Sequence, residues 1–448
     1  MPPAGTTYYL APAAAGGNDY NNGLSPSAPW LSPNHYVNCG DVIIAAPSTS
    51  YSYVNFQTFG TVTCSAGNNV AWLKCATFDG CKISFSASLR VGIQVGASYW
   101  GVQGWEVDGT SATGNCFYAA PSTTANIHHV IFANDIANGC GLSGFGSSVE
   151  SGNYGVDYVV VLGTIAYANS GGSVNCSSGI SIYEPVASDT LPGTHIYVAG
   201  NFGWLNVNGN PCAGGAPSDG EGLILDTLDG DQTSMPIPYR GQVVADNNIF
   251  VSNGGRGLTA VGNWEGTAPY SNVYLRHNTL WGNNTDTNQT QTYCGELLLS
   301  YVRTTEAYLN IAEPTSATGC GANTLYVFYV GGSYSTALLY NNFGYRASSQ
   351  NIGTNNNTGF VAGPNNTFSN PSFANAVAPG APSCGSATSV PNCMATVIAN
   401  FTPTNAAAVG YGYQIPSSTS VYDPLFPQWL CKVNLPTGLI SMGCKAGP

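Results

Sequence analysis

The chain has 448 residues, of which only 7% are charged, and 10 Lys and Arg against 22 Asp and Glu give a formal net charge of −12. The 56 Gly and 27 Pro follow no three-residue period, which excludes collagen, and no apolar run reaches the roughly 20 residues of a membrane span. The acidic balance argues against a nucleic-acid partner, because binding phosphates needs clustered Lys and Arg. Asn, Ser, Thr and Gly fill the polar positions that helix formers would occupy in a helical protein, so the composition favours a β-rich fold.

The cysteines indicate where the protein folds. Their number is 14, and several lie close in sequence, such as Cys75 with Cys81 and Cys384 with Cys393. Neither a Cys-x-x-Cys pair nor a zinc-finger spacing with His occurs, so we expect disulfides, with their connectivity left open. No secretion signal is visible after Met1, but the cysteines favour a secreted or extracellular protein whose signal was removed or that is exported by another route.

Residues 1–45 are the first predicted unit. They hold short apolar segments separated by turn-forming residues, such as the stretch from Gly17 to Pro26. A solenoid needs its open ends covered, so we expect this segment to cap the N-terminal end of one.

Residues 46–365 carry an internal repeat of alternating apolar residues that run into Asn. The copies end at Asn134, Asn201, Asn248, Asn278, Asn310 and Asn342, and from Asn248 onward the steps by subtraction are 30, 32 and 32 residues. Stacked Asn side chains bond to one another and to the turn backbone, so this ladder is predicted to be structural. A repeat of about this length is typical of stacked coils.

A second short strand follows a Gly in three of the coils. These strands span residues 179–183, 222–226 and 257–261. Alternation predicts an inner set of side chains, namely Ile180, Ile182, Leu223, Leu225, Leu258 and Ala260. The outer set is then Ser181, Tyr183, Ile224, Asp226, Thr259 and Val261. The pattern predicts an all-β fold, a right-handed parallel β-helix.

Residues 366–448 are rich in Pro, Ser, Ala and Cys and lose the ladder. We expect an irregular C-terminal extension that packs on the β-helix or caps its other end.

Both ends of the chain resemble a known group of proteins. Tyr8-Tyr9-Leu10-Ala11-Pro12, Pro29-Trp30 and Asn370-Pro371-Ser372-Phe373 are similar to the opening and closing segments of bacterial secreted β-helix proteins of the pectate-lyase-like superfamily. The resemblance implies the same fold and a polysaccharide or other glycan as partner. It does not choose a reaction, because this superfamily holds lyases, hydrolases, epimerases and phage tailspikes.

The densest acidic segment is the candidate site. Between residues 218 and 231 it holds five carboxylates, Asp219, Glu221, Asp226, Asp229 and Asp231. Such clustering causes repulsion that a cation, a shared proton or an arginine must offset. Arg256 precedes the next Gly-Leu strand, so we expect it about one rung, roughly 4.8 Å, from Glu221.

Glycoside hydrolysis is the leading interpretation, because it needs one protonated carboxylic acid and one ionised carboxylate. Asp226 on the outer face is the first candidate, Glu221 or Asp219 is its partner, and Arg256 completes the catalytic set. The candidates for substrate binding from neighbouring rungs and a nearby loop are Tyr183, Glu184, Trp264, Glu265 and Glu296.

Two alternatives stay open. β-Elimination from a uronate is one, since Ser218-Asp219-Gly220 followed by Asn253-Gly254-Gly255-Arg256 resembles the layout of calcium-dependent pectate lyases. Gly255 and Arg256 stand where those enzymes have paired aspartates, and no central Lys supplies a base. Calcium held near Asp229 and Asp231 stays a hypothesis. The other alternative is a non-enzymatic surface fibre, tailspike-like adhesin or glycan-binding solenoid that self-associates.

One ion pair is predicted outside the site. Arg276 aligns with Asp246 one rung earlier, so we expect a bond between them.

Overall fold

The structure is a computed structural model. It describes residues 5–64, 69–86, 91–109, 114–121, 125–149, 154–172, 176–208, 219–228, 238–262, 272–288, 294–315, 320, 324–332, 336–347, 351–355, 359–415, 422–433 and 435. None of the helices in these ranges has the length and hydrophobicity needed to cross a membrane.

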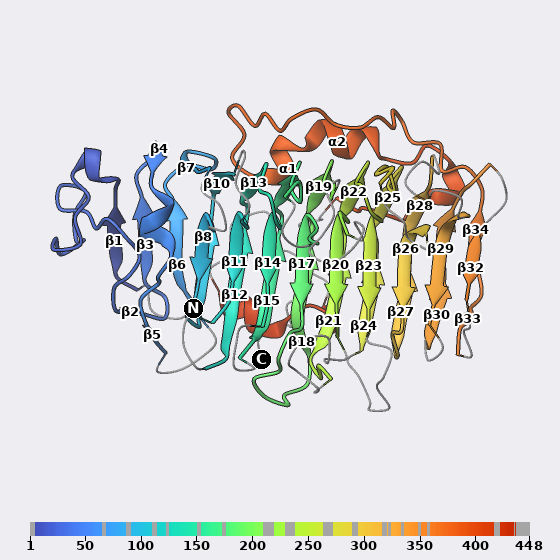
Figure 1. Ribbon diagram of the computed structural model, residues 1–448, viewed down its shortest axis with the longest axis horizontal. Coiled ribbons are helices and arrows are strands. Elements are labelled where there is room, and N and C mark those ends of the chain that lie inside the picture. The colour runs from blue at the N-terminus through green and yellow to red at the C-terminus, as the bar shows by residue number, and fades with distance from the viewer. Residues whose placement is uncertain are drawn as a thin grey trace.

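The chain winds into stacked coils whose strands form three long parallel sheets (Figure 1). Within the described residues, sheet 1 has 12 strands, sheet 2 has 11 and sheet 3 has nine. Neighbours in each sheet come from successive coils, as in β12–β15–β18, and from β6 to β32 each coil passes from sheet 1 to sheet 2 to sheet 3. The predicted parallel β-helix is therefore confirmed.

The bounds of the elements are as follows. Sheet 1 consists of β1 (Thr7–Leu10), β3 (Val42–Ala45), β6 (Ala71–Cys75), β9 (Trp100–Gln103), β12 (Ile127–Ala133), β15 (Val156–Leu162), β18 (Thr194–Ala199), β21 (Gln242–Asp246), β24 (Val273–Arg276), β27 (Thr305–Tyr308), β30 (Ala337–Tyr340) and β33 (Val361–Ala362). Sheet 2 consists of β4 (Ser48–Tyr51), β7 (Cys81–Ser84), β10 (Trp105–Asp108), β13 (Ile136–Asn138), β16 (Ile165–Tyr167), β19 (Phe202–Trp204), β22 (Ile249–Val251), β25 (Thr279–Trp281), β28 (Ile311–Glu313), β31 (Phe343–Gly344) and β34 (Thr367–Phe368). Sheet 3 consists of β8 (Ile93–Val95), β11 (Phe117–Ala119), β14 (Phe145–Ser147), β17 (Ile180–Tyr183), β20 (Leu223–Asp226), β23 (Leu258–Val261), β26 (Cys294–Ser300), β29 (Leu325–Gly331) and β32 (Ile352–Thr354). The remaining elements are the pair β2 (Val37–Asn38) and β5 (Val62–Thr63), the helices α1 (Val390–Cys393) and α2 (Ala395–Asn400), and the 3₁₀ turns η1 (Ala13–Ala15), η2 (Tyr53–Phe56), η4 (Ala406–Ala408) and η5 (Gln428–Lys432).

The core runs along the inside of the coils. All six side chains that alternation placed inward in β17, β20 and β23 belong to it, and the six predicted to point outward do not. Ile224 is nevertheless buried, at 5% exposure, although it points outward. The outer face of sheet 3 is therefore partly covered.

One asparagine ladder follows the corner between sheets 1 and 2. The side-chain amide of each residue donates to the oxygen of the next at 2.8–3.1 Å, from Asn201 through Asn248, Asn278, Asn310 and Asn342 to Asn366. Thr164 precedes Asn201 and donates to it at 2.9 Å. These chains of bonds satisfy buried polar groups at the bend.

The expected ladder position of Asn134 is wrong. Asn134 has φ 61° and lies in the left-handed turn, and its side chain accepts the N–H of Val390 at 2.6 Å. The corresponding rung is Asp135, which accepts the N–H of Trp105 at 2.9 Å. Adjacent Asn and Asp both suit a turn, so the pattern placed the rung one residue early.

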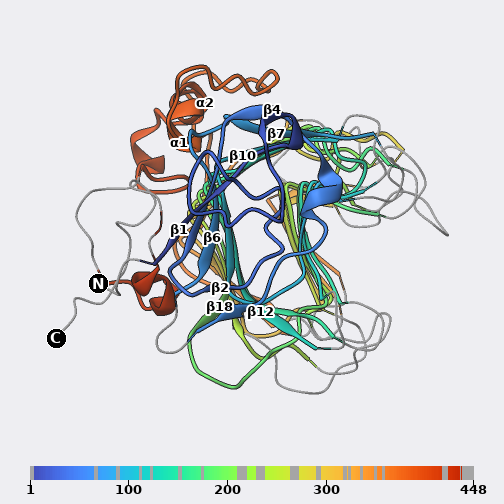
Figure 2. The ribbon, with the colours of Figure 1, turned by 90° about the vertical axis from the view of Figure 1, so that its left-hand side faces the viewer.

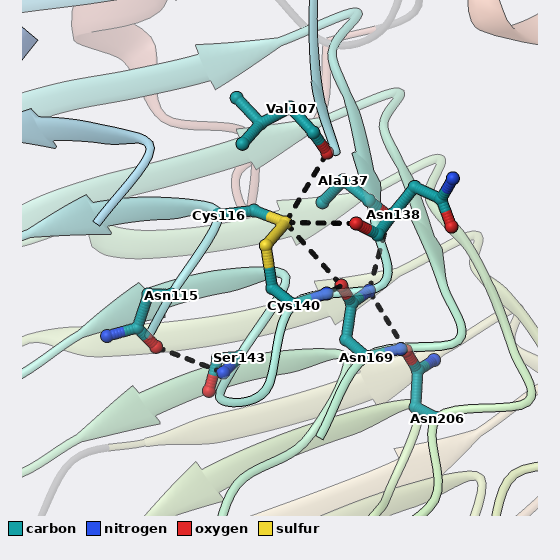
Figure 3. The surroundings of a disulfide bond; sticks show 9 residues. All are labelled: Val107, Asn115, Cys116, Ala137, Asn138, Cys140, Ser143, Asn169 and Asn206. Atoms are coloured by element: carbon teal, nitrogen blue, oxygen red, sulfur yellow. Dashed lines mark hydrogen bonds between the residues drawn. A yellow bond between two sulfur atoms is a disulfide. The ribbon is translucent and has the colours of Figure 1, made fainter. Parts of the chain in front are cut away.

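A second, unforeseen ladder follows the corner between sheets 2 and 3. Asn169 donates to Asn206, Asn206 to Asn253 and Asn253 to Asn283, at 2.8–3.1 Å. Figure 3 shows its start, where Asn169 accepts the N–H of Cys140, half of the Cys116–Cys140 disulfide.

The glycine before β17 is required by this ladder. A Cβ on Gly179 would lie 2.5 Å from the side-chain nitrogen of Asn206, closer than any real contact. Glycines at the start of sheet 3 strands therefore leave room for the side chains of the second ladder.

Disulfides hold several coils. Those within the described residues are Cys39–Cys64, Cys75–Cys81, Cys116–Cys140, Cys294–Cys320 and Cys384–Cys393. Cys176 and Cys431 are also disulfide-bonded.

The C-terminal extension covers two outer faces of the solenoid. Val390, Met394 and Phe401 pack on apolar side chains of sheet 2, and Phe426, Trp429 and Leu430 pack on those of sheet 1. The predicted bond between Arg276 and Asp246 is confirmed at 2.8 Å, and Arg276 also pairs with Asp423 of the extension. In Figure 2 the described parts of the extension lie against sheets 1 and 2 and away from sheet 3.

Candidate functional site

The outer face of sheet 3 is where the structure gathers the predicted site residues. Tyr183 and Asp226 are register partners at the carboxyl ends of β17 and β20, and both are half-buried. The C-terminal extension packs on the outer faces of sheets 1 and 2, so its described parts leave the outer face of sheet 3 uncovered.

Asp226 has the chemistry of a proton donor. Burial raises its pKa to about 6, a hydrogen bond from Thr227 opposes the rise, and the charges of Glu221 and Glu184 add to it. The Thr227 hydroxyl donates to Asp226 Oδ1 at 3.0 Å. Such a carboxyl holds its proton to higher pH than an ordinary aspartate.

Glu184 lies beside Asp226. Its N–H donates to the main-chain oxygen of Asp226 at 3.1 Å, and its side chain is buried at 1% exposure. Glu184 and Thr227 both have positive φ, 44° and 53°, so the chain turns sharply after each strand. Glu184 directly follows Tyr183, the register partner of Asp226, and its charge contributes to the raised pKa of Asp226. We call Asp226 and Glu184 the carboxylate pair.

Glu221 and Arg256 meet one rung apart, as the alignment predicted. The Nη1 atom of Arg256 lies 3.0 Å from Glu221 Oε1, and the Ser178 hydroxyl donates to Glu221 Oε2 at 2.8 Å. Both residues are buried, with exposures of 0% and 5%. Both carboxylate oxygens of Glu221 are therefore engaged, and its charge is balanced.

Ser178 was missed by the sequence reasoning. The signal for it was present, because aligning Gly179 with Gly222 and Gly257 places Ser178 in the same column as Glu221 and Arg256.

Glu296 lies inside the coil at the end of the second ladder. Its oxygens accept the N–H of Asn283 at 3.0 Å and the side-chain amide of Asn283 at 2.6 Å, and it has 0% exposure. Burial raises its pKa to about 8, against the bonds from Asn283 and with a contribution from Glu313. The structure thus places Glu296 away from the outer face.

The remaining predicted residues divide into two groups. Asp219 is half-buried and precedes Gly220, whose φ of 95° turns the chain toward Glu221. Trp264, Glu265, Asp229 and Asp231 lie outside the described residues. Within the described ranges, no three His, Cys, Asp or Glu side chains are arranged to hold a metal ion.

Several solved structures are similar to the chain at low sequence identity. No protein-family model matches the chain, and no characterised protein matches it in sequence. Among solved structures, it is similar to pectate lyase Pel9A, with 16% identity, 82% of each chain covered and a TM-score of 0.39. It is also similar to the GH136 lacto-N-biosidase from Eubacterium ramulus, with 12% identity, 81% of this chain and 67% of that chain covered and a TM-score of 0.40. A third similar structure is the A-module of the mannuronan C-5 epimerase AlgE4 from Azotobacter vinelandii, with 11% identity, 73% and 91% coverage and a TM-score of 0.36.

Proposed function

We propose that the protein is an extracellular carbohydrate-active enzyme that hydrolyses glycosidic bonds on the outer face of sheet 3. Asp226 is the general acid, and Glu184 is the second carboxyl group, which acts as base or nucleophile. The observation that carries the proposal is the raised pKa of Asp226, which burial and the charges of Glu221 and Glu184 bring to about 6. Glycoside hydrolysis uses an acid whose pKa is raised in this way, together with a second carboxyl group.

Glu221 has a supporting role beside Asp226. Glu221 is bonded to Arg256 and Ser178, so its charge is already balanced inside the wall of the site. Arg256 and Ser178 then stabilise Glu221, whose negative charge helps to keep Asp226 protonated.

Hydrolysis is favoured over elimination for a chemical reason. Elimination needs a base that removes a proton next to a carboxylate, often Lys or Arg, together with a positive charge for that carboxylate. No lysine occurs between Lys82 and Lys432, and the guanidinium of Arg256 faces Glu221. The disulfides support the extracellular location, because they persist in oxidising compartments.

The test is a screen of neutral and uronate polysaccharides that records new reducing ends and the ultraviolet absorbance of unsaturated uronates. We expect reducing ends without absorbance. Asp226→Asn and Glu184→Gln should each lower kcat/KM by about 10²- to 10⁴-fold. Asp108→Asn, which removes a half-buried carboxylate of sheet 2, is the matched control and should keep wild-type activity.

Other outcomes would overturn the proposal. Absorbance together with reducing ends identifies a lyase, with Tyr183 beside Asp226 as the first base to examine. If neither signal appears across a broad panel of polysaccharides, the fibre or glycan-binding solenoid is favoured. Light scattering would then detect its self-association. Full activity of Asp226→Asn removes the acid assignment.

A further inference from the structure

A charged cluster around a buried aspartate lies where the connections that follow β17 and β20 reach sheet 1. Its centre is Asp157 in β15, with 0% exposure. Asp157 accepts hydrogen bonds from the Tyr239 hydroxyl at 2.5 Å and from the N–H and hydroxyl of Ser188 at 2.6 and 2.8 Å. The Nδ1 atom of His195 lies 3.0 Å from Asp157 Oδ1. We call Asp157, Ser188, His195 and Tyr239 the Asp157 cluster.

His195 is positively charged in this arrangement. Its Nδ1 faces the Asp157 carboxylate, and its Nε2 lies 2.9 Å from the main-chain oxygen of Leu191. Both neighbours only accept hydrogen bonds, so both ring nitrogens carry hydrogen. Burial opposes this, but the bond and charge of Asp157 outweigh it and raise the pKa of His195 above its ordinary value.

The cluster is not a hydrolase triad, although Ser, His and Asp are present. The Ser188 hydroxyl donates to Asp157 rather than to His195, and the Nε2 atom that would activate a serine is turned toward Leu191.

The cluster instead joins the two connections that carry the carboxylate pair. Ser188 belongs to the connection that begins with Glu184, directly after β17. Tyr239 closes the connection that begins with Thr227, and its N–H donates to the oxygen of Leu228 at 2.8 Å. The N–H of Val186 donates to the oxygen of Val156, next to Asp157, at 3.1 Å. Glu184 is thus two residues from Val186, and Asp226 is two residues from Leu228, and both of these positions are held by backbone hydrogen bonds.

Close packing restricts the side chains of the Asp157 cluster. The ring of Tyr158 stacks on His195 with centroids 3.9 Å apart. A Cβ on Gly241 would lie 2.5 Å from the Tyr239 hydroxyl and 2.7 Å from His195 Cγ, so only glycine permits this approach. The titratable groups that face His195 are Asp157, Asp189, Tyr158, Tyr239 and His129.

We infer that the Asp157 cluster is a positioning device for the reaction, which holds the connection after β17 and the two described ends of the connection after β20 so that Glu184 and Asp226 keep their mutual geometry. This inference rests on the proposed function. Asp157, His195 and Tyr239 are buried at 0%, 1% and 1% exposure, so they act on the reaction through the connections, as positioning residues. A displacement of about 1 Å in such a device can cost about 100-fold in rate.

The test compares Asp157→Asn, His195→Gln and Tyr239→Phe with Asp41→Asn. Asp41 is a matched control, because it is also a buried carboxylate that accepts two backbone N–H bonds, in the N-terminal segment far from sheet 3. We expect the first two variants to lower kcat by about 10- to 100-fold with little change in KM. Tyr239→Phe keeps the ring packing and should lose less, and Asp41→Asn should keep wild-type kcat.

Hydrogen exchange gives a readout that needs no substrate. The amides of Ser188 and Tyr239 should exchange faster in Asp157→Asn than in the wild type, and should be unchanged in Asp41→Asn. Unchanged exchange at these amides would overturn the inference whatever the activity. Wild-type kcat in Asp157→Asn overturns the inference alone, whereas a wild type that cleaves no glycan overturns the proposed function and the inference with it.

Discussion

The wild-type protein should lose stability between acidic and neutral pH because of Glu296, and the variant Glu296→Gln should not. The carboxyl group of Glu296 is fully buried and ends the second ladder, and burial raises its pKa from 4.5 to about 8. Between these two values the folded protein holds a proton that the unfolded chain releases. The contribution of Glu296 is therefore fully favourable below about pH 4.5 and is lost as the pH rises toward 8.

The magnitude follows from the pKa difference. One pH unit in this window costs about 1.4 kcal/mol, so the free energy of unfolding falls by about 3 kcal/mol between pH 5 and pH 7. Unfolding entropy near 2 cal/mol/K per residue amounts to about 0.9 kcal/mol/K for 448 residues, so Tm falls by about 3 °C.

Glutamine can keep the end of the ladder because one amide oxygen can accept both bonds. Asn310 Oδ1 already does so, accepting the N–H and the side-chain amide of Asn278 at 3.0 and 2.9 Å. The difference in unfolding free energy between Glu296→Gln and the wild type should shift by about 3 kcal/mol in favour of the variant from pH 5 to pH 7. Glu296→Ala should show the same pH trend at lower stability, because the donors of Asn283 lose their acceptor.

Guanidinium unfolding at pH 5, 6 and 7 with the disulfides intact measures these differences, and calorimetry checks the Tm values. A difference between Glu296→Gln and the wild type that stays constant with pH would show that Glu296 is ionised in the folded protein, and the reasoning would be wrong.

Three further predictions use other parts of the structure. Gly179→Ala should destabilise the protein by about 2 kcal/mol or more in thermal unfolding, because its methyl group meets a ladder amide, whereas Gly380→Ala has open space and should be neutral. Arg276→Gln should cost about 3 kcal/mol and loosen the C-terminal extension, which limited proteolysis would detect, because Asp423 loses its ion pair. The kcat/KM for a cleaved glycan should fall as the pH rises through about 6, because Asp226 must be protonated to act as the acid; a flat profile from pH 5 to 8 would contradict this.

The repeat in the sequence was sufficient to predict the coil. The similar steps of 30, 32 and 32 residues between Asn248, Asn278, Asn310 and Asn342 reflect coils of similar length whose Asn side chains stack within hydrogen-bonding distance, and this similarity made the repeat visible in the sequence. The second ladder was also readable, because its members follow those of the first at a constant offset, as Asn253 follows Asn248.

The candidate site was only partly predictable. The contact of Glu221 with Arg256 followed from aligning glycines in successive coils, since register fixes which side chains are neighbours. The role of Glu184 depends on its own left-handed backbone conformation after Tyr183, and glutamate has no preference for that conformation that would predict it. The Asp157 cluster joins residues 31 to 82 positions apart that share no repeat, so pattern reasoning had no signal for it.

The path of the C-terminal extension has a consequence for how the chain folds. Val390 bonds to Asn134, 256 residues earlier, and Leu425 accepts a bond from Thr194, 231 residues earlier. These contacts close very long loops and cannot form before the coils that they touch. Until then, apolar side chains such as Phe202 and Tyr197 face water on the outside of sheets 2 and 1. The nascent solenoid therefore passes through an aggregation-prone stage, and shortening the chain at residue 365 would make that stage permanent.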